Sequence, residues 1–347
     1  MSLIDIAGEL FAIAGAICFG VGNVIIKSQG NKISPFGINA IRLTLSAIIY
    51  IIIVAAMGIL NATFTLNWKT GLFLAGGTFI GVVVGDMIFF FSQQLIGLSR
   101  AYPIAVSYPL MTYIVGMIIG AESFAWVRMV GVILVIIGVY FVSISTKSVK
   151  TDEESVLSNE KSVDNEMDTE ETKEETLTQE SDIKDKLENK PEANLLDKPL
   201  TKKRLILGIT GAATTAICWT IGTVLMDQAF ELESLEGMPA NAFRIVCVAP
   251  ISLLIFATTN RGKYKSKFSW KGVLLVILAG IIGNTAGGLL YAFALQFSTA
   301  STTAAITAAA PLVATPLSVL FLKEKISWKL IVGTIITIGG IWLIILF

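Results

Sequence analysis

The amino-acid sequence predicts an all-α polytopic membrane protein in which ten transmembrane helices form two inverted five-helix repeats. Three observations lead to this fold class. The 347 residues are 54% hydrophobic with a mean hydropathy of +0.74, which argues against a soluble chain. The apolar residues gather into runs long enough to cross a bilayer. The second half of the chain repeats the first.

The repeat is clearest between residues 68 and 140. A constant offset of 202 positions takes Trp68 onto Trp270 and Glu122 onto Glu324 without a gap. The same offset matches a glutamine, a proline and three glycines: Gln94 with Gln296, Pro109 with Pro311, Gly81 with Gly283, Gly131 with Gly333 and Gly138 with Gly340. A fixed-period match of this length indicates two copies of one module.

Ten apolar runs of about 20 residues are expected to be transmembrane helices. They cover residues 7–27, 36–59, 70–93, 101–121, 124–145, 203–226, 239–258, 271–293, 302–322 and 326–347. The repeat extends into the first two spans of each half, because Gly22 matches Gly222 and Arg42 matches Arg244. Five spans per half is an odd number, so the two halves must cross the membrane in opposite senses. Such inverted repeats are frequent in secondary transporters.

The charges divide the chain into three parts. Residues 151–200 hold 17 acids and 6 lysines, a balance of −11, whereas the other 297 residues hold 9 acids and 20 bases, a balance of +11. We therefore expect a first repeat at 1–146, an acidic disordered linker at 147–201 and a second repeat at 202–347. A segment this polar cannot bury enough apolar surface to fold alone. It is either a solvated tether or a site for a protein partner.

The sequence disfavours an enzyme. It contains no histidine and only three cysteines, Cys18, Cys218 and Cys247, all in apolar runs. Without histidine the chain lacks the commonest general base and the commonest metal ligand, and the cysteines form no C-x-x-C pair. We expect no catalytic residue, no metal and no cofactor. The expected partners are a small-molecule solute and the lipid bilayer, with no nucleic acid.

In order along the chain, the motifs resemble those of EamA-type members of the drug/metabolite transporter superfamily. Each half has an arginine early in its second span (Arg42, Arg244), a proline within the fourth (Pro109, Pro311), a glutamate at the turn before the fifth (Glu122, Glu324) and glycines seven residues apart in the fifth. The resemblance covers nearly all of the chain outside 147–201. It implies a ten-helix carrier of metabolites or drugs, with both termini in the cytoplasm.

Ionisable groups within apolar spans are costly and usually face a protein interior or a wet cavity. Asp86 lies deep in the third span, and its repeat counterpart is Gly288, so the acid belongs to one half alone. It is either a proton-coupling carboxylate, a counter-charge for a cationic solute, or a buried partner of Arg42. Arg42 and Arg244 either bind an anionic group through their bidentate forks or reach to the interface as structural anchors.

Prolines at matching depth in two repeats point to a solute site, because each breaks a transmembrane helix. We predict a cavity walled by spans three, four, eight and nine. Its other candidate polar residues are Asn23, Gln93, Gln94, Tyr102, Tyr108, Thr112, Tyr113, Asn284, Tyr291 and Gln296. The amides either orient a solute or bridge helices. The threonines of span nine and Phe89-Phe90-Phe91 are interpreted as packing residues, and Glu122 and Glu324 as carboxylates at the N-termini of their own helices.

The leading functional hypothesis is a secondary transporter of the cell membrane that moves a small metabolite, such as an amino acid, by alternating access. No Walker A loop is present, so a proton or solute gradient would drive it. The alternatives are a multidrug or cationic-compound exporter and a membrane-anchored scaffold acting through its acidic linker.

The charge distribution and the family resemblance predict opposite orientations in the membrane. The loops between spans one and two, seven and eight, and nine and ten carry 9 of the 14 lysines outside residues 151–200, so the positive-inside rule puts both termini outside and the linker in the cytoplasm. The family resemblance implies the reverse. We expect the charge argument to prevail.

Overall fold

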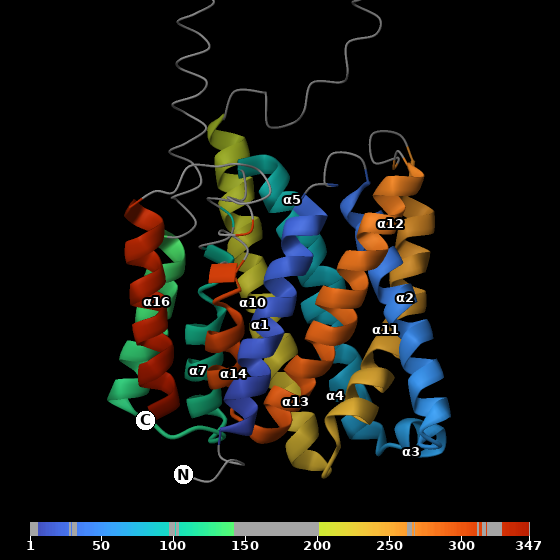
Figure 1. Ribbon diagram of the computed structural model, residues 1–347, viewed down its shortest axis with the longest axis horizontal. Helices are drawn as coiled ribbons and strands as arrows, with labels where there is room; N and C mark the ends of the chain where they lie inside the picture. Colours follow the sequence, from blue (N-terminus) through green and yellow to red (C-terminus); the bar gives the residue numbers. More distant parts are fainter. Residues whose placement is uncertain are drawn as a thin grey trace, which may run out of the picture.

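The structure is a computed structural model in which the described residues form a bundle of helices without strands (Figure 1). It describes residues 6–27, 29, 33–96, 101, 104–141, 201–261, 266, 268–310, 312–313, 317 and 328–346. The linker expected at 147–201 lies outside these ranges except for Thr201, so its disorder stays a prediction.

The first half consists of five helical segments with one short connecting helix. They are α1 (Ala7–Lys27), α2 (Pro35–Ala56), the short α3 (Leu60–Phe64), a continuous rod of α4 (Trp68–Thr78), η1 (Phe79–Gly85) and α5 (Asp86–Ile96), then α7 (Tyr108–Ile118) and the helix Trp126–Phe141. The second half repeats this order. It has α10 (Lys202–Leu232), α11 (Gly237–Thr259), a rod of α12 (Trp270–Ala279), η4 (Gly280–Gly287) and α13 (Gly288–Phe297), then α14 (Ala300–Thr307) and α16 (Trp328–Leu346).

Six of the described helices are long and apolar enough to span a membrane, and three shorter apolar helices accompany them. The chain is therefore a multi-span membrane protein. Span nine, expected at 302–322, is described through α14 and a few residues beyond it, so the count of ten spans stays a prediction. The equivalent first helices α1 and α10 run in opposite directions through the bundle (Figure 1), as an inverted repeat requires.

Polar residues fix where several helices begin. Ser34 precedes α2 and its side chain accepts a hydrogen bond from the Gly37 amide at 3.2 Å, with Pro35 in the first turn. Ser269 does the same for α12 through the Gly272 amide at 3.1 Å. A side-chain oxygen at this position satisfies an amide that has no partner within the helix, and proline tolerates the first turn because its missing N–H is not needed there.

The two halves exchange their first helices. α1 packs against η4, α12, α13 and α14 of the second half, whereas α10 packs against α4, η1, α5 and α7 of the first. The second helices, α2 and α11, pack against each other between these groups. The last helices, Trp126–Phe141 and α16, meet through the predicted glycine faces, where Gly131 and Gly340 leave no room for a side chain. The main packing partners of each first helix therefore belong to the opposite half.

Glycines permit the closest of these crossings. A Cβ added at Gly22 would lie 3.0 Å from the Cα of Gly283, and one added at Gly222 would lie 2.8 Å from the carbonyl oxygen of Gly77. Helices that approach this closely in lipid gain packing contacts that replace a hydrophobic driving force. Each crossing falls beside a third span, so the glycines also set the distance between the halves at mid-bundle.

The third span of each half contains a π-helical segment at the same place in the repeat. η1 ends at Gly85 and η4 at Gly287, which are related by the offset of 202. Each is followed at once by a residue of interest, Asp86 in the first half and Gly288 in the second. π-Helical turns are rare and occur mostly at functional sites. They re-aim the side chains that follow them.

Candidate solute-binding cavity

A cavity of about 220 Å³ lies between the two halves. Its walls come from both halves and include residues of α1, α2, the two π-helical rods, α7, α10, α11 and the end of α14. Seven of the residues that the sequence singled out line it: Asn23, Arg42, Asp86, Tyr108, Arg244, Asn284 and Tyr291. The walls extend beyond the expected spans three, four, eight and nine to spans one, two, six and seven.

The lining is arranged in repeat-related pairs. One member of each pair comes from each half. The pairs include Phe19 with Trp219, Asn23 with Thr223, Arg42 with Arg244, Val82 with Asn284, Asp86 with Gly288 and Phe89 with Tyr291. The cavity therefore sits at the junction of the two repeats. Secondary transporters with inverted repeats place their solute site at such a junction.

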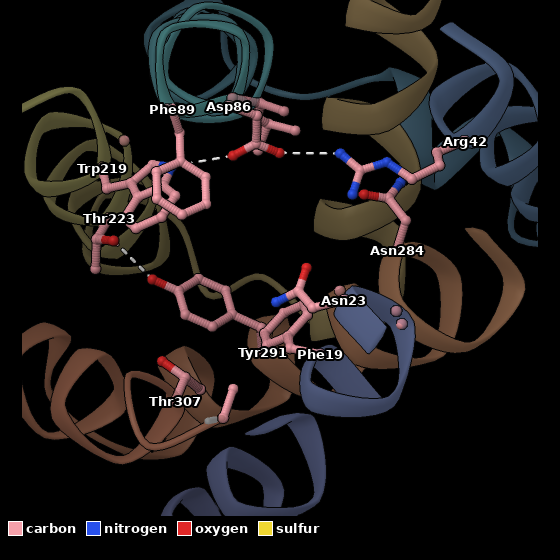
Figure 2. A pocket seen from close by; sticks show the side chains of 18 of the residues that line it. Phe19, Asn23, Arg42, Asp86, Phe89, Trp219, Thr223, Asn284, Tyr291 and Thr307 are labelled. Atoms are coloured by element: carbon pink, nitrogen blue, oxygen red, sulfur yellow. Dashed lines mark hydrogen bonds and ion pairs between the residues drawn. The ribbon is translucent and has the colours of Figure 1, made fainter. Parts of the chain in front are cut away.

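On the first-half side, Asp86 is held between two partners (Figure 2). The Arg42 guanidinium donates to its Oδ2 at 3.0 Å, and the Trp219 indole Nε1 donates to its Oδ1 at 3.0 Å. Arg42 also donates to Asn39 Oδ1 at 2.9 Å and stacks over the Phe90 ring, 5.7 Å from its centroid. Both charges are thus compensated, in agreement with the sequence alternative of a buried Asp86–Arg42 pair.

On the second-half side, Arg244 has no such partner. Its Nε donates to Asn241 Oδ1 at 2.7 Å, and its NH2 makes a long contact of 3.4 Å with the Gly288 carbonyl oxygen. Arg244 is 6% exposed, and within the described residues no carboxylate lies within ion-pair distance of it. A burial this deep makes an uncompensated charge costly.

Neutral polar groups occupy the rest of the second-half side. The hydroxyls of Tyr291 and Thr223 lie 2.7 Å apart, and the Asn284 amide donates to Ser46 Oγ at 3.1 Å. Ser46 also lies 2.8 Å from the Thr285 hydroxyl, and Tyr50 donates to the Thr285 carbonyl. The bonds of Ser46 and Tyr50 connect α2 to η4, and the first of these residues also orients the Asn284 side chain.

Span four enters the cavity through Tyr108. Its hydroxyl donates to the Ala304 carbonyl at 3.0 Å and lies 3.1 Å from the Thr307 hydroxyl. Thr307 lines the cavity too, so span nine contributes more than the packing that the sequence suggested. Pro109 lies in the first turn of α7 instead of inside a helix. The break in span four thus precedes Pro109, because proline is tolerated where its N–H is not needed.

The other sequence candidates lie away from the cavity or outside the described residues. Thr112 donates to the Tyr108 carbonyl at 2.9 Å, Tyr113 accepts from the Ala125 amide at 2.7 Å, and Gln296 accepts from the Gly237 amide at 2.8 Å. The Thr112 bond lies within α7, whereas Tyr113 and Gln296 each connect two different segments of the chain. Gln93 lies on α5 and does not line the cavity. Tyr102, Pro311 and the side chain of Gln94 are outside the described part of the chain.

Aromatic residues are the lining that sequence reasoning missed. Phe19, Phe89, Phe90 and Trp219 all line the cavity, although Phe89 and Phe90 were interpreted as packing residues. The Phe89 and Trp219 rings lie 5.1 Å apart. The signal was present in the repeat, because Phe19 and Trp219 precede the matched Gly22 and Gly222 by three residues.

Glu122 caps a different helix from the one that the sequence analysis predicted. Its carboxylate accepts from the Ser301 amide at 3.0 Å and from the Ser301 hydroxyl, and Arg128 lies 3.7 Å away. The carboxylate therefore caps α14 of the other half, where it favours the positive end of that helix. Glu324 lies outside the described residues.

A model of the EamA-like transporter family matches residues 6–144 and 206–346. The chain belongs to the EamA-like transporter family. The two matches coincide with the two repeats, and the unmatched stretch between them, residues 145–205, contains the acidic segment.

The curated relatives are also transporters by name. The chain is 31% identical over 144 residues to the uncharacterized inner membrane transporter YhbE of Escherichia coli K12, and 25% identical over 137 residues to an uncharacterized transporter of Clostridium kluyveri. Each alignment covers 40% of this chain and 43% of the relative's length. A solved crystal structure shares the fold with a TM-score of 0.69 at 14% identity, covering 98% of this chain and 97% of the other.

Proposed function

We propose that this EamA-family protein is a secondary transporter of the cell membrane that moves a small amphipathic metabolite, such as an amino acid or a related metabolite, by alternating access. The observation that carries the proposal is the cavity at the junction of two inverted repeats, lined in pairs by both of them. The inner-membrane description of the YhbE relatives supports the location.

Asp86 is proposed as the proton-coupling group. It is the one carboxylate among the described lining residues, and its charge balances that of Arg42 at 3.0 Å. Protonation of Asp86 would release Arg42 and change the charge of the cavity. Such a change gives the two end states of the cycle different affinities for the solute, as coupling requires.

An exporter of cationic compounds is the less favoured alternative. That function needs Asp86 as a counter-charge for the solute, whereas Arg42 and Trp219 already occupy both of its oxygens. A scaffold acting through residues 147–201 is a further alternative of another class, and it would need no paired lining at the repeat junction.

The test uses purified protein in liposomes with a panel of labelled amino acids and carboxylic acids. We expect counterflow of at least one solute, and uptake driven by a proton gradient. Asp86→Asn should abolish gradient-driven uptake and leave exchange intact. Asp227→Asn removes an acid from α10 that does not line the cavity, so it should retain both activities.

Two outcomes would contradict the proposal. Unchanged gradient-driven uptake in Asp86→Asn would remove this residue from coupling. Absence of counterflow across the whole panel would favour the scaffold.

A further inference from the structure

The two halves differ most at one pair of positions, and the difference concerns charge. In the first half Asp86 neutralises Arg42, whereas the equivalent position in the second half is Gly288 and leaves Arg244 without an acid. We propose that Arg244 is the receptor for the carboxylate of the transported solute and that the preferred solute is an organic anion with an apolar body and no cationic group. This inference rests on the proposed transport function. It keeps an amphipathic solute but replaces the amino acid named there with an organic anion that has no ammonium group.

The charges of the lining support an anion. Among the described residues that line the cavity, Arg42, Arg244 and Asp86 are the charged ones. The Arg42–Asp86 pair is neutral, so the cavity carries one positive charge at Arg244. Burying an ion without a partner costs several kcal/mol. Charged residues inside membrane spans accordingly mark solute pathways. A single carboxylate would compensate Arg244.

The guanidinium has the donors for this role. A guanidinium carries five N–H donors in a planar fork that suits a carboxylate. The described residues supply Arg244 with two acceptors, Asn241 Oδ1 and the distant Gly288 carbonyl. Arg42, by contrast, has Asn39, Asp86 and the Phe90 face as partners. Arg244 is thus the arginine that is able to accept a ligand without giving up a carboxylate partner.

The space for the ligand carboxylate lies at Gly288. A Cβ added there would be 3.5 Å from Arg244 NH2 and 3.8 Å from Asn241 Oδ1, which are ordinary contact distances. The missing side chain therefore leaves room next to the guanidinium, in the place that an acid occupies in the first half. A solute carboxylate would take the position of that absent acid.

The same lining disfavours an ammonium group on the solute. Asp86 is the carboxylate that would receive it, and both of its oxygens already accept hydrogen bonds. The body of the solute would instead meet aromatic rings, since Phe19, Phe89, Trp219 and Tyr291 line the cavity. An aryl or branched monocarboxylate fits these walls.

The experiment compares three probes that share one phenyl group and differ in charge: 3-phenylpropionate, phenylalanine and phenethylamine. Binding to the purified full-length protein is measured from the shift in its unfolding temperature as each probe is titrated, because a ligand stabilises the state that it binds. We expect 3-phenylpropionate to bind most tightly and phenethylamine to produce no shift.

The decisive variant is Gly288→Asp, which gives Arg244 the internal partner that Arg42 has. It should weaken 3-phenylpropionate binding at least about 30-fold, which corresponds to about 2 kcal/mol at 1.4 kcal/mol per tenfold. Gly288→Asn adds a side chain of similar volume without charge, so its smaller loss measures the effect of volume. Arg244→Gln should lose binding as Gly288→Asp does, and Arg244→Lys should retain part of it. Lys271→Gln removes an exposed charge at the start of α12 and should change nothing.

The inference is overturned by any of three binding results. The first is that 3-phenylpropionate fails to stabilise the wild-type protein. The second is that phenylalanine or phenethylamine binds as tightly. The third is that Gly288→Asp binds as tightly as Gly288→Asn, a result that counts even if Arg244→Gln fails to fold. Counterflow measurements separate this inference from the proposed function. Counterflow of phenylalanine or phenethylamine, but not of 3-phenylpropionate, would reject the anion receptor and leave the transport function standing. Counterflow of no solute would reject the transport function itself.

Discussion

Arg42 and Arg244 occupy the same position in two copies of one module, and their surroundings differ in one way that matters. Each donates to the asparagine three residues before it, Asn39 or Asn241. Only the first copy then adds an acid, Asp86, where the second has Gly288. Both repeats therefore hold an arginine at the same position through an asparagine. The residue at position 86 or 288 then determines whether the charge of that arginine is neutralised within the protein or can bind a ligand.

The largest expected difference between the two arginine sites is in the free energy of unfolding when their charges are removed or left unpaired. Asp86→Ala removes one member of a buried ion pair and should lower the free energy of unfolding by about 3 kcal/mol, because Arg42 is left without a counter-charge. Arg244→Gln removes a charge that already lacks a partner, so it should cost much less. Denaturant unfolding of both variants in the same detergent measures the difference, with Asp227→Ala as the control. Equal losses for Asp86→Ala and Arg244→Gln would mean that the two arginines are equally compensated.

A smaller effect is expected at the glycine crossings. Gly222→Ala places a Cβ 2.8 Å from the Gly77 carbonyl oxygen and 3.0 Å from the Gly81 Cα, so it should destabilise by about 2 kcal/mol through overpacking. Gly22→Ala meets the Gly283 Cα at 3.0 Å and should cost about 1 kcal/mol. Gly76→Ala, which meets no atom within 4 Å, is the matched control. If all three variants unfold at the same denaturant concentration, the crossings are looser than the distances indicate.

The smallest effect concerns the pair Phe89 and Tyr291. Tyr291→Phe makes the second half like the first at this position and removes the hydroxyl that lies 2.7 Å from Thr223. The loss should be about 1 kcal/mol, the usual contribution of one hydrogen bond. A double-mutant cycle with Thr223→Val isolates the pair. A coupling energy near zero would show that the two hydroxyls bond elsewhere.

Much of this arrangement follows from the sequence, because repeats and apolar spans are properties of a single chain. The match of Arg42 with Arg244, the one-sided acid at 86 and the idea that Asp86 pairs with Arg42 all came from residue identities and spacing. The family, the helical class and a cavity between repeats followed from the same features.

What the sequence missed depends on which helices are neighbours. Gln296 caps α11 through the Gly237 amide, and Glu122 caps α14 of the other half, contacts that no spacing along the chain specifies. The π-helical turns before Asp86 and Gly288 come beside glycine crossings made by the exchanged first helices. Phe89 and Phe90 were interpreted as packing residues because three consecutive phenylalanines do not indicate which face of the helix is internal. The packing of α10 against α5 shows which face of α5 is internal.

The exchange of first helices has a consequence for how the chain assembles during synthesis. α1 is made before its packing partners α12, η4, α13 and α14, which begin at Trp270, 243 positions after Lys27 (270 − 27). Until then the glycine-bearing face of α1 is exposed to lipid, and the contacts that complete it are among the least local in the chain, which slows folding. α10 finds its partners α4, η1 and α5 already inserted. The second half therefore packs onto a first half that is already in the membrane. The covalent connection through residues 142–200 gives the two halves a high effective concentration for this association.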